Sequence, residues 1–235
     1  MIHSLLGVWI RMTETIESVE VDWIGHATVK LEDSDGKVVY IDPWSEVMKN
    51  KTGKADLIIS THNHFDHFDK KAIQALKKRS TVLVCTENSI SEVPEDLSHK
   101  VIKPGTGVDA KGVHIRGVHA YNIDKFREPD TPYHPKGFST GVIFELDGIK
   151  FYHAADTDPI QEMERLWEEN IDVAFLPIGG KYTMDQEEVI AAIQMIRPEK
   201  VVPIHYGYID HTDADIEKFK EEVKEKTGAE PLVFD

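Results

Sequence analysis

Three histidines and an aspartate lie within six positions of this sequence, in the segment His62-Asn63-His64-Phe65-Asp66-His67. His62 and His64 are two residues apart, so an extended backbone directs both side chains the same way. Asp66 and His67 follow after a bend, so the loop can offer one pair of ligands to each of two neighbouring ions. Imidazole and carboxylate suit zinc and related metals. The spacing therefore predicts a metal-binding segment rather than a solvated polar loop.

The stretches on either side predict a rigid frame for this segment. Residues 56–59 form an apolar run that is typical of a short buried strand. Residues 69–76 are typical of a helix whose first turn is capped by Asp69. Loops between such elements commonly carry binding residues, because the elements fix both of their ends.

The rest of the chain alternates short strands with turns and helices. Strands are predicted at residues 19–23, 28–32, 37–41, 81–85, 142–146, 149–152, 172–176 and 201–204. Residues 33–36 and the pair Asp147-Gly148 are hairpin signals. Apolar helical faces are predicted from Ile160, Met163, Leu166 and Trp167, and from Ile216, Phe219 and Val223. Hairpins followed by strand–helix units in both halves predict an α+β fold of four layers, a β-sandwich with helices on both outer faces.

The His-x-His-x-Asp-His pattern resembles the signature of the metallo-β-lactamase superfamily. Three other stretches support the resemblance: Trp23-Ile24-Gly25-His26-Ala27, Tyr40-Ile41-Asp42-Pro43 and Leu176-Pro177-Ile178-Gly179-Gly180. The resemblance extends from about Val19 to His211 and is closest to a branch of compact metal-dependent hydrolases related to sugar-acid lactonases. It implies the same four-layer sandwich, with the metals at one edge where the two halves meet.

The resemblance also implies a set of metal ligands. In that superfamily a lone histidine, a bridging aspartate and a final histidine follow the metal loop at the ends of strands, and His119, Asp156 and His205 stand at such places. The implied first site is His62, His64 and His119, and the second is Asp66, His67 and His205, with Asp156 between them. Two divalent ions are expected, zinc foremost, with manganese or iron as alternatives. Asp66 is expected to be catalytic, both as a ligand and as the group that orients a metal-bridging hydroxide.

Six further residues are candidates for supporting the ligands or contacting the substrate: His26, Asp42, His134, His153, Lys181 and Tyr206. Metal-bound histidines usually donate their second N–H to a carboxylate or carbonyl, which is the role expected of Asp42. Residues 120–137 lack regular patterning, so they are either a binding loop beside the metals or a packed connector. Lys136, Lys181 and Arg127 are the candidate partners for an anionic group on a substrate.

A competing motif is Gly137-Phe138-Ser139-Thr140-Gly141, which matches the serine-hydrolase pattern G-x-S-x-G. A nucleophile elbow needs a strand before the serine and a helix after it. Here a strand is predicted to follow, so we interpret Ser139 as a turn residue that opens the second hairpin.

Composition narrows the classes of function. The chain has 235 residues and a net charge of −15, which disfavours nucleic-acid binding and a processing nuclease, because such proteins neutralise phosphates with basic patches. The single cysteine, Cys85, cannot form an internal disulfide, so a cytoplasmic location is expected. No membrane association is expected, because the apolar stretch at residues 5–10 is too short for a membrane span. Self-association into a homo-oligomer is compatible with the sequence.

We expect residues 1–17 to be an N-terminal extension, with the first eleven dispensable, and residues 18–235 to form one hydrolase domain. The expected activity is metal-dependent hydrolysis of a small-molecule ester, lactone or phosphoester. The alternatives are a phosphodiesterase or nuclease acting on nucleotides, and a non-catalytic metal-binding protein that keeps the fold.

Overall fold

Short runs of β-branched and aromatic residues, separated by turns, form most of the strands. In β2 (Val19–Gly25), Val19 and Val21 are buried while Glu20 between them is exposed, so one face of the strand packs on the core. The predicted turn after β3 (Thr28–Glu32) is closed by the Gly36 N–H, which donates to the Asp33 carbonyl at 2.9 Å. The chain then returns as β4 (Val38–Ile41).

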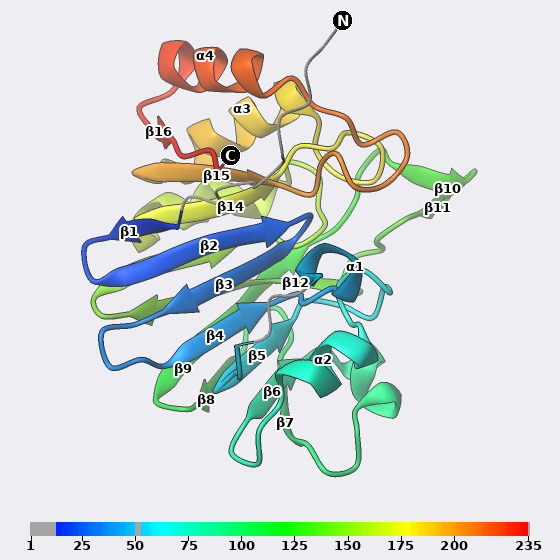
Figure 1. Cartoon of the computed structure of the whole chain (residues 1–235). Coiled ribbons are helices and arrows are strands. Elements are labelled where there is room, and N and C mark those ends of the chain that lie inside the picture. Colours follow the sequence, from blue (N-terminus) through cyan, green and yellow to red (C-terminus); the bar gives the residue numbers. More distant parts are fainter. Residues whose placement is uncertain (1–12, 50–52, 235) are drawn as a thin grey trace, which may run out of the picture.

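The computed structural model describes residues 13–49 and 53–234, and its strands form two large sheets (Figure 1). The first sheet has the order β1 (Glu14–Ile16), β2, β3, β4, β5 (Leu57–Ser60), β6 (Val82–Cys85) and β7 (Ser98–Val101). The second has the order β16 (Glu230–Pro231), β15 (Lys200–Ile204), β14 (Val173–Pro177), β13 (Ile149–His153), β12 (Ser139–Leu146), β9 (Val113–Ala120) and β8 (Gly107–Ala110). A small hairpin of β10 (Phe126–Glu128) and β11 (Thr131–Pro132) stands away from both sheets.

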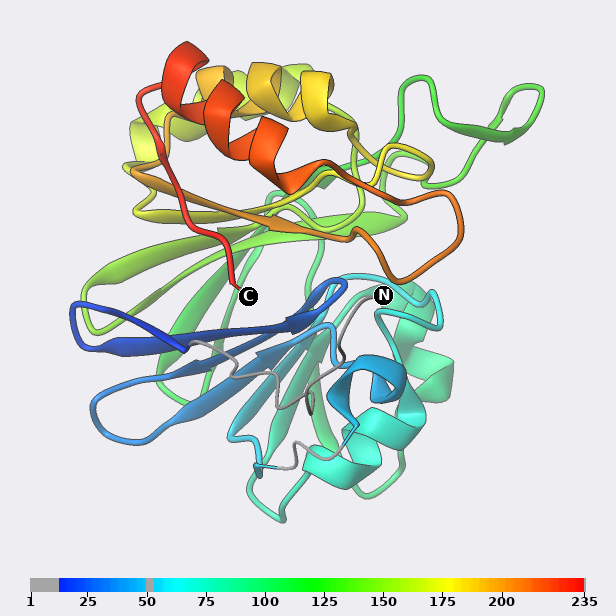
Figure 2. The ribbon, with the colours of Figure 1, turned by 45° about the horizontal axis from the view of Figure 1, so that its top comes forward.

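The sheets pack face to face and helices cover their outer faces (Figure 2). The outer face of the first sheet packs on α1 (Ser45–Met48) and α2 (Lys70–Leu76), with η1 (Glu87–Glu92) following β6. The outer face of the second packs on η2 (Gln161–Glu169), α3 (Gln186–Ile196) and α4 (Ile216–Lys226). The predicted four-layer fold is confirmed.

Each sheet is antiparallel on one side and parallel on the other. Strands β4 to β7 are parallel in the first sheet, and β13 to β16 are parallel in the second. Parallel strands deliver their carboxyl ends to one edge, where ligands bind in open α/β sheets. The loops after β5, β13 and β15 therefore become the place to look for a site.

Three local predictions differ from the structure. Glu14–Ile16 pairs with β2 as strand β1, so the end of the predicted extension is part of the sheet, whereas residues 1–12 lie outside the described residues. Trp167 was expected on a buried helical face but is 52% exposed. Its segment is a 3₁₀ helix with three residues per turn, so Ile160, Met163 and Leu166 share the buried side and Trp167 leaves it.

Ser139 is the first residue of β12 and pairs with Ala120, so the predicted turn at this position is wrong. The strand that follows it was predicted correctly, and a serine that begins a strand does not form a nucleophile elbow. Among the helices of the described residues, none has the length and apolar character that a membrane span needs.

Candidate metal centre

The loop after β5 is held in shape by its own backbone and by Ser60. The Ser60 hydroxyl donates to the His67 carbonyl at 2.9 Å, and the N–H groups of His67 and Phe68 both bond to the His64 carbonyl. Asp69 then accepts from the N–H groups of the first turn of α2, as its type and position predicted. The loop thus presents its histidines from a fixed turn.

Two groups of side chains meet at this edge of the sandwich. The first group consists of His62, His64, His134 and Asp156. His64 Nδ1 lies 3.1 Å from His62 Nε2 and 3.1 Å from His134 Nε2, and His134 Nε2 lies 3.1 Å from Asp156 Oδ2. Two nitrogens bound to one tetrahedral zinc at about 2.05 Å would lie roughly 3.3 Å apart, so the spacing suits a shared ion.

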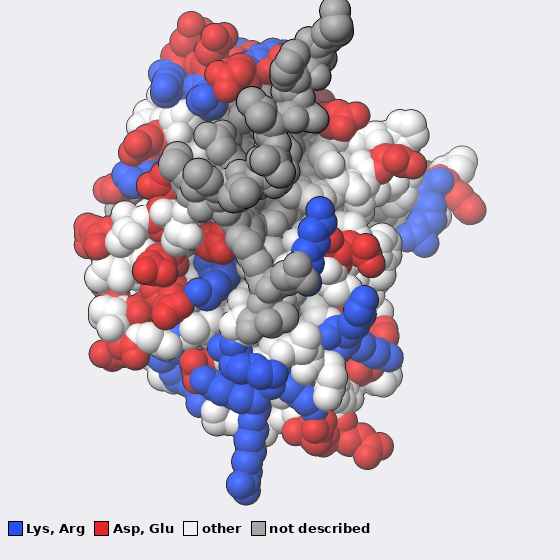
Figure 3. Space-filling model, viewed as in Figure 1, with Lys and Arg blue, Asp and Glu red and all other residues white. Residues whose placement is uncertain are grey.

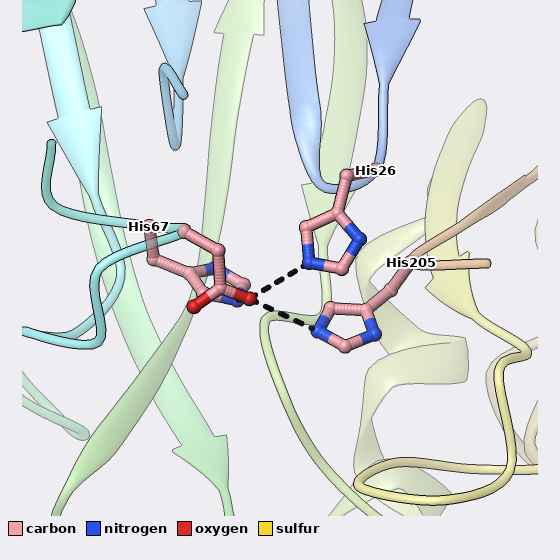
Figure 4. A group of neighbouring side chains, drawn as sticks. His26, His67 and His205 are labelled. Carbon is pink, nitrogen blue, oxygen red and sulfur yellow. Dashed lines mark hydrogen bonds and ion pairs between the residues drawn. The ribbon is translucent and has the colours of Figure 1, made fainter. Parts of the chain in front are cut away.

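The second group consists of His26, Asp66, His67 and His205. Asp66 Oδ2 lies 2.8 Å from His26 Nε2, 3.4 Å from His67 Nε2 and 3.7 Å from His205 Nε2. Figure 4 shows the three imidazoles turned towards one carboxylate, each arriving from a different segment of the chain. His26 follows β2, and His205 follows β15 in the other sheet.

Asp156 lies between the two groups. Its Oδ1 is 3.3 Å from His67 Nε2, and its Oδ2 is 3.1 Å from both His134 Nε2 and His205 Nε2. The side chain is almost fully buried. One carboxylate is thus within reach of ligands from both groups, which is the arrangement of a bridging ligand.

Neighbouring polar groups orient the histidines from behind. His67 Nδ1 lies 2.7 Å from Asp42 Oδ2, and Asp42 in turn accepts from the N–H and hydroxyl of Thr61. His134 Nδ1 lies 2.8 Å from Asn122 Oδ1. Such partners fix which ring nitrogen carries the proton and leave the opposite nitrogen free to bind a metal.

The backbone at this edge adopts a conformation that side chains disfavour. His26, Asp42, Ala155 and His205 have φ values of +53°, +45°, +59° and +57°. Non-glycine residues at such angles cost about 1–3 kcal/mol each and cluster at functional sites. Each of the four lies just beyond a strand end, where the left-handed turn aims a ligand or its neighbour into the site.

Buried charges determine each other's protonation here. Burial alone raises the pKa of Asp66, but the charge of His67 and a hydrogen bond from His26 hold that pKa well below its usual range. Burial likewise raises the pKa of Asp156, and the fields of His205 and His67 outweigh it. His67 responds in the opposite sense: burial lowers its pKa, but Asp156 and Asp66 raise it well above its usual range. Without a metal ion, a protonated His67 provides positive charge beside the two ionised carboxylates, and a bound cation would provide it instead.

Several buried donor atoms in the site have no hydrogen-bond partner. They are His67 Nε2, Asp156 Oδ1 and both ring nitrogens of His205. A buried polar atom left unpaired costs about 1–3 kcal/mol, so such a cluster calls for an explanation. Imidazole nitrogens and carboxylate oxygens that converge on common points fit divalent metal ions.

The structure brings His134, and not the expected ligand His119, into the first group. His119 is the last residue but one of β9, where it pairs with Thr140, and it lines a different cavity together with Thr86 and Lys103. Within the described residues it belongs to neither group. His134 had been expected only to support the site or contact substrate. It reaches the first group because Asn122 binds both its ring and its N–H, a tertiary contact that sequence spacing does not reveal.

Of the remaining candidate residues, some lie at the site and others lie away from it. His26 and Asp42 lie at the site, as described above. His153 braces the Asp156 turn, since its Nδ1 accepts from the Ala155 N–H and its Nε2 donates to the Ala27 carbonyl. Tyr206 stacks on Trp23 with ring centroids 5.0 Å apart, and Lys181 is exposed.

A cavity of about 410 Å³ opens onto both groups. The residues that line it are His64, Phe65, Asp66, Arg127, Tyr133, His134, Asp156, Tyr182, His205 and Ile209. Lys181 and Tyr206 are not among these described lining residues. The cavity has the size of a small-molecule site, and aromatic and aliphatic side chains share its lining with the candidate metal ligands.

Residues 20–205 match the family model described as the beta-lactamase superfamily domain. A UPF0173 metal-dependent hydrolase of Thermus thermophilus is 36% identical over 215 residues, covering 88% of this chain and 92% of that protein. Another from Natranaerobius thermophilus is 31% identical over 226 residues, covering 92% and 96%.

Solved structures of similar proteins support the same family assignment. A metallo hydrolase from Ignicoccus hospitalis has a TM-score of 0.75 at 29% identity, with 92% of this chain and 94% of that chain covered. A Parabacteroides distasonis protein to which metal-dependent hydrolysis is ascribed has a TM-score of 0.82 at 32% identity, with 95% and 98% covered. The predicted resemblance to the metallo-β-lactamase superfamily is confirmed.

Proposed function

This chain belongs to the β-lactamase superfamily as a metal-dependent hydrolase, and we propose that it holds two divalent ions and hydrolyses a small-molecule ester, lactone or phosphoester. The observation that carries the proposal is the position of Asp156, within 3.3 Å of His67 on one side and 3.1 Å of His134 on the other. A single ion would account for only one of these two contacts. Zinc is the metal proposed first, and manganese and iron suit the same ligands.

We assign the ligands by what each side chain already binds. His62, His64 and His134 would hold the first ion, Asp66, His67 and His205 the second, and Asp156 both. His26 is left out of the ligand set, because its Nε2 lies 2.8 Å from Asp66 and acts as a hydrogen-bond donor there. Burial, helped by the nearby His205, lowers the pKa of His26 to about 4, so the ring is neutral near pH 7.

When bound, the ions would lower the pKa of a water and stabilise negative charge on the attacked group. The chain's own residues position that water and the substrate. Asp66 lines the cavity and stays ionised, so it accepts a hydrogen bond from the attacking water and orients it. His26 fixes the Asp66 carboxylate from behind, and Phe65 and Tyr133 line the cavity beside it.

The size and apolar lining of the cavity favour a small molecule. The net charge of −15 disfavours long polyanions such as RNA. The resemblance to lactonases makes lactones the first substrates to try. The absence of a nucleophile elbow at Ser139 within the described chain leaves hydrolysis to a water rather than to a covalent intermediate.

The test is a screen of metal-reconstituted protein on lactones, aryl esters and bis-p-nitrophenyl phosphate, with metal content measured in parallel. About two ions per chain are expected, and a chelator should abolish turnover reversibly. Asp66→Asn should lower kcat by about 100-fold or more. Asp210→Asn is the matched control, because it removes the same charge from an exposed loop residue outside the cavity lining.

Chelator-resistant turnover that disappears in Ser139→Ala would overturn the proposed mechanism. Preferential cleavage of RNA or DNA over every small substrate would overturn the proposed substrate class. Two bound ions without turnover of any ester, lactone or phosphoester would favour the non-catalytic alternative.

A further inference from the structure

The cavity beside the metal centre contains one cationic side chain. Of the described residues that line it, Arg127 is the only lysine or arginine. Candidate metal ligands, including Asp66 and Asp156, line the same cavity, and so do Tyr133 and Tyr182. A substrate whose reacting group lies at the metals would therefore extend along aromatic rings and meet a cation.

Arg127 is an exposed residue whose side chain contacts one wall of the cavity. It lies in the β10–β11 hairpin, where Phe126 pairs with Pro132 and the Tyr133 N–H donates to the Lys125 carbonyl. Its guanidinium carbon lies 5.9 Å from the centroid of the Tyr133 ring, a cation–π contact. Tyr133 in turn meets Tyr182 edge to face at 4.9 Å. The guanidinium therefore lies beside the aromatic side chains that line the cavity.

Unlike nearby cations, Arg127 has no anionic partner among the residues that the structure describes. Lys136 binds Glu162 at 2.5 Å, and Lys125 binds Glu188 at 2.6 Å. In the part of the chain that the structure describes, no carboxylate lies within ion-pair distance of Arg127. Of the three cations considered from the sequence, the structure selects this one, because Lys136 and Lys181 do not line the cavity.

The net negative charge of the whole molecule makes a cation in the cavity important for binding an anionic substrate. Acidic side chains outnumber basic ones by 42 to 27, and acidic and basic side chains intermingle over much of the face in Figure 3. An anionic molecule is therefore repelled at long range and needs a local cation to be retained. A guanidinium offers two parallel N–H groups that match a carboxylate or phosphate.

We propose that the substrate carries an oxyanion, a carboxylate or phosphate group, which Arg127 binds while the reacting ester or lactone lies at the metal centre. The inference rests on the proposed function and specifies its substrate class: an anionic small molecule with an apolar or aromatic middle that packs against Tyr133 and Tyr182. Arg127 is then a specificity-determining residue rather than a catalytic one.

The test compares esters that differ only in charge. 4-Acetoxybenzoate, 4-acetoxyphenylacetate and 3-(4-acetoxyphenyl)propionate are each paired with the corresponding carboxamide, and 4-acetoxyphenylphosphonate tests the phosphate arm. The kcat and KM values are measured for metal-loaded wild type, Arg127→Gln and Arg127→Lys. The control is Arg165→Gln, which removes an exposed arginine of η2 that does not line the cavity. Calorimetry with the acetamido analogues of the same acids and amides measures binding without turnover.

Wild type should prefer at least one anionic ester over its carboxamide by about tenfold or more, chiefly through KM. Arg127→Gln should abolish that preference in both kinetics and calorimetry, Arg127→Lys should retain part of it, and Arg165→Gln should retain all of it. The best anionic probe identifies whether carboxylate or phosphonate is the better match.

The inference would be overturned if wild type showed no preference for anionic esters over their carboxamides, or if Arg127→Gln showed an equal preference. Metal-dependent turnover of the carboxamides would still support the proposed function. If the metal-loaded protein hydrolyses none of these esters, the proposed function is tested by the lactones and the phosphodiester of the screen. Calorimetry still decides the inference: anion binding that weakens at least tenfold in Arg127→Gln alone supports it, and unchanged binding refutes it.

Discussion

Replacing His134 with alanine should remove the ion of the first group, whereas replacing His119 with alanine should remove none. His134 Nε2 lies 3.1 Å from both His64 Nδ1 and Asp156 Oδ2, so it is one of three imidazoles that converge on that group. His119 lines a separate cavity with Thr86. The pair of variants therefore changes the same residue type inside and outside the site.

The expected magnitude follows from what His134 contributes. Removing only a hydrogen-bond partner of a ligand lowers metal affinity about 10- to 100-fold. Removing the ligand itself should exceed this, so we expect a loss of at least about 100-fold, or about 2.7 kcal/mol of binding free energy. The second group keeps Asp66, His67 and His205, so the metal content should fall from two ions per chain to one.

Equilibrium dialysis against buffered zinc, followed by elemental analysis, measures both the stoichiometry and the affinity. Circular dichroism shows whether each variant is folded, and a cobalt-substituted sample gives a visible spectrum that reports the remaining site. The reasoning would be refuted if His134→Ala retained two ions with unchanged affinity, or if folded His119→Ala lost one.

Three further outcomes are expected. Asp42→Asn should weaken zinc binding about 10- to 100-fold, because Asp42 orients His67 at 2.7 Å; unchanged affinity in competition with a chromophoric chelator would contradict this. Gly179→Ala should lower the free energy of unfolding in urea by about 1–3 kcal/mol, since an added Cβ would clash with the backbone carbonyl oxygen of His205. The control Gly228→Ala, with no atom within 4 Å of the added Cβ, should stay within about 0.5 kcal/mol of wild type. Burial raises the pKa of the Cys85 thiol from 9.0 to about 11, which keeps the thiol protonated at higher pH. At pH 8, alkylation by iodoacetamide should thus be about 100-fold slower in the folded than in the unfolded protein, and equal rates by mass spectrometry would refute the burial argument.

Local patterns in the sequence identified those parts of the site that follow directly from a strand end. The candidate ligands of the 62–67 loop lie between an apolar run and a capped helix, and each of these elements can be predicted from a short stretch of sequence. Asp156 and His205 were found because each follows a strand and the family resemblance assigns a ligand there. In these cases the element that positions the ligand adjoins it in sequence.

His134 could not be found in this way, because its position depends on contacts distant in sequence. Asn122, which binds the His134 ring, is itself bound by Asp158, 36 residues further along the chain. The β10–β11 hairpin between Asn122 and His134 is short and mostly exposed, so it leaves little hydrophobic pattern. His119 lies at a strand end and fits the expected order, but its side chain lines another cavity. Only tertiary structure distinguishes the two histidines.

Metal binding should also stabilise the fold, because each group takes ligands from both sheets. His62 and His64 follow β5 of the first sheet, whereas Asp156 follows β13 of the second, and the second group likewise joins His67 to His205. An ion bound only by the native protein raises the free energy of unfolding by about 2.7 kcal/mol when its free concentration is 100 times the dissociation constant. The melting temperature should therefore rise with zinc and return to its initial value with a chelator, and the rise should be smaller in Asp156→Asn, whose carboxamide is a poor ligand for either ion. Equal melting temperatures of metal-loaded and metal-free wild type would show that the two sheets are joined firmly without the ions. In that case the packing of the sandwich core, rather than the site, would hold the halves together.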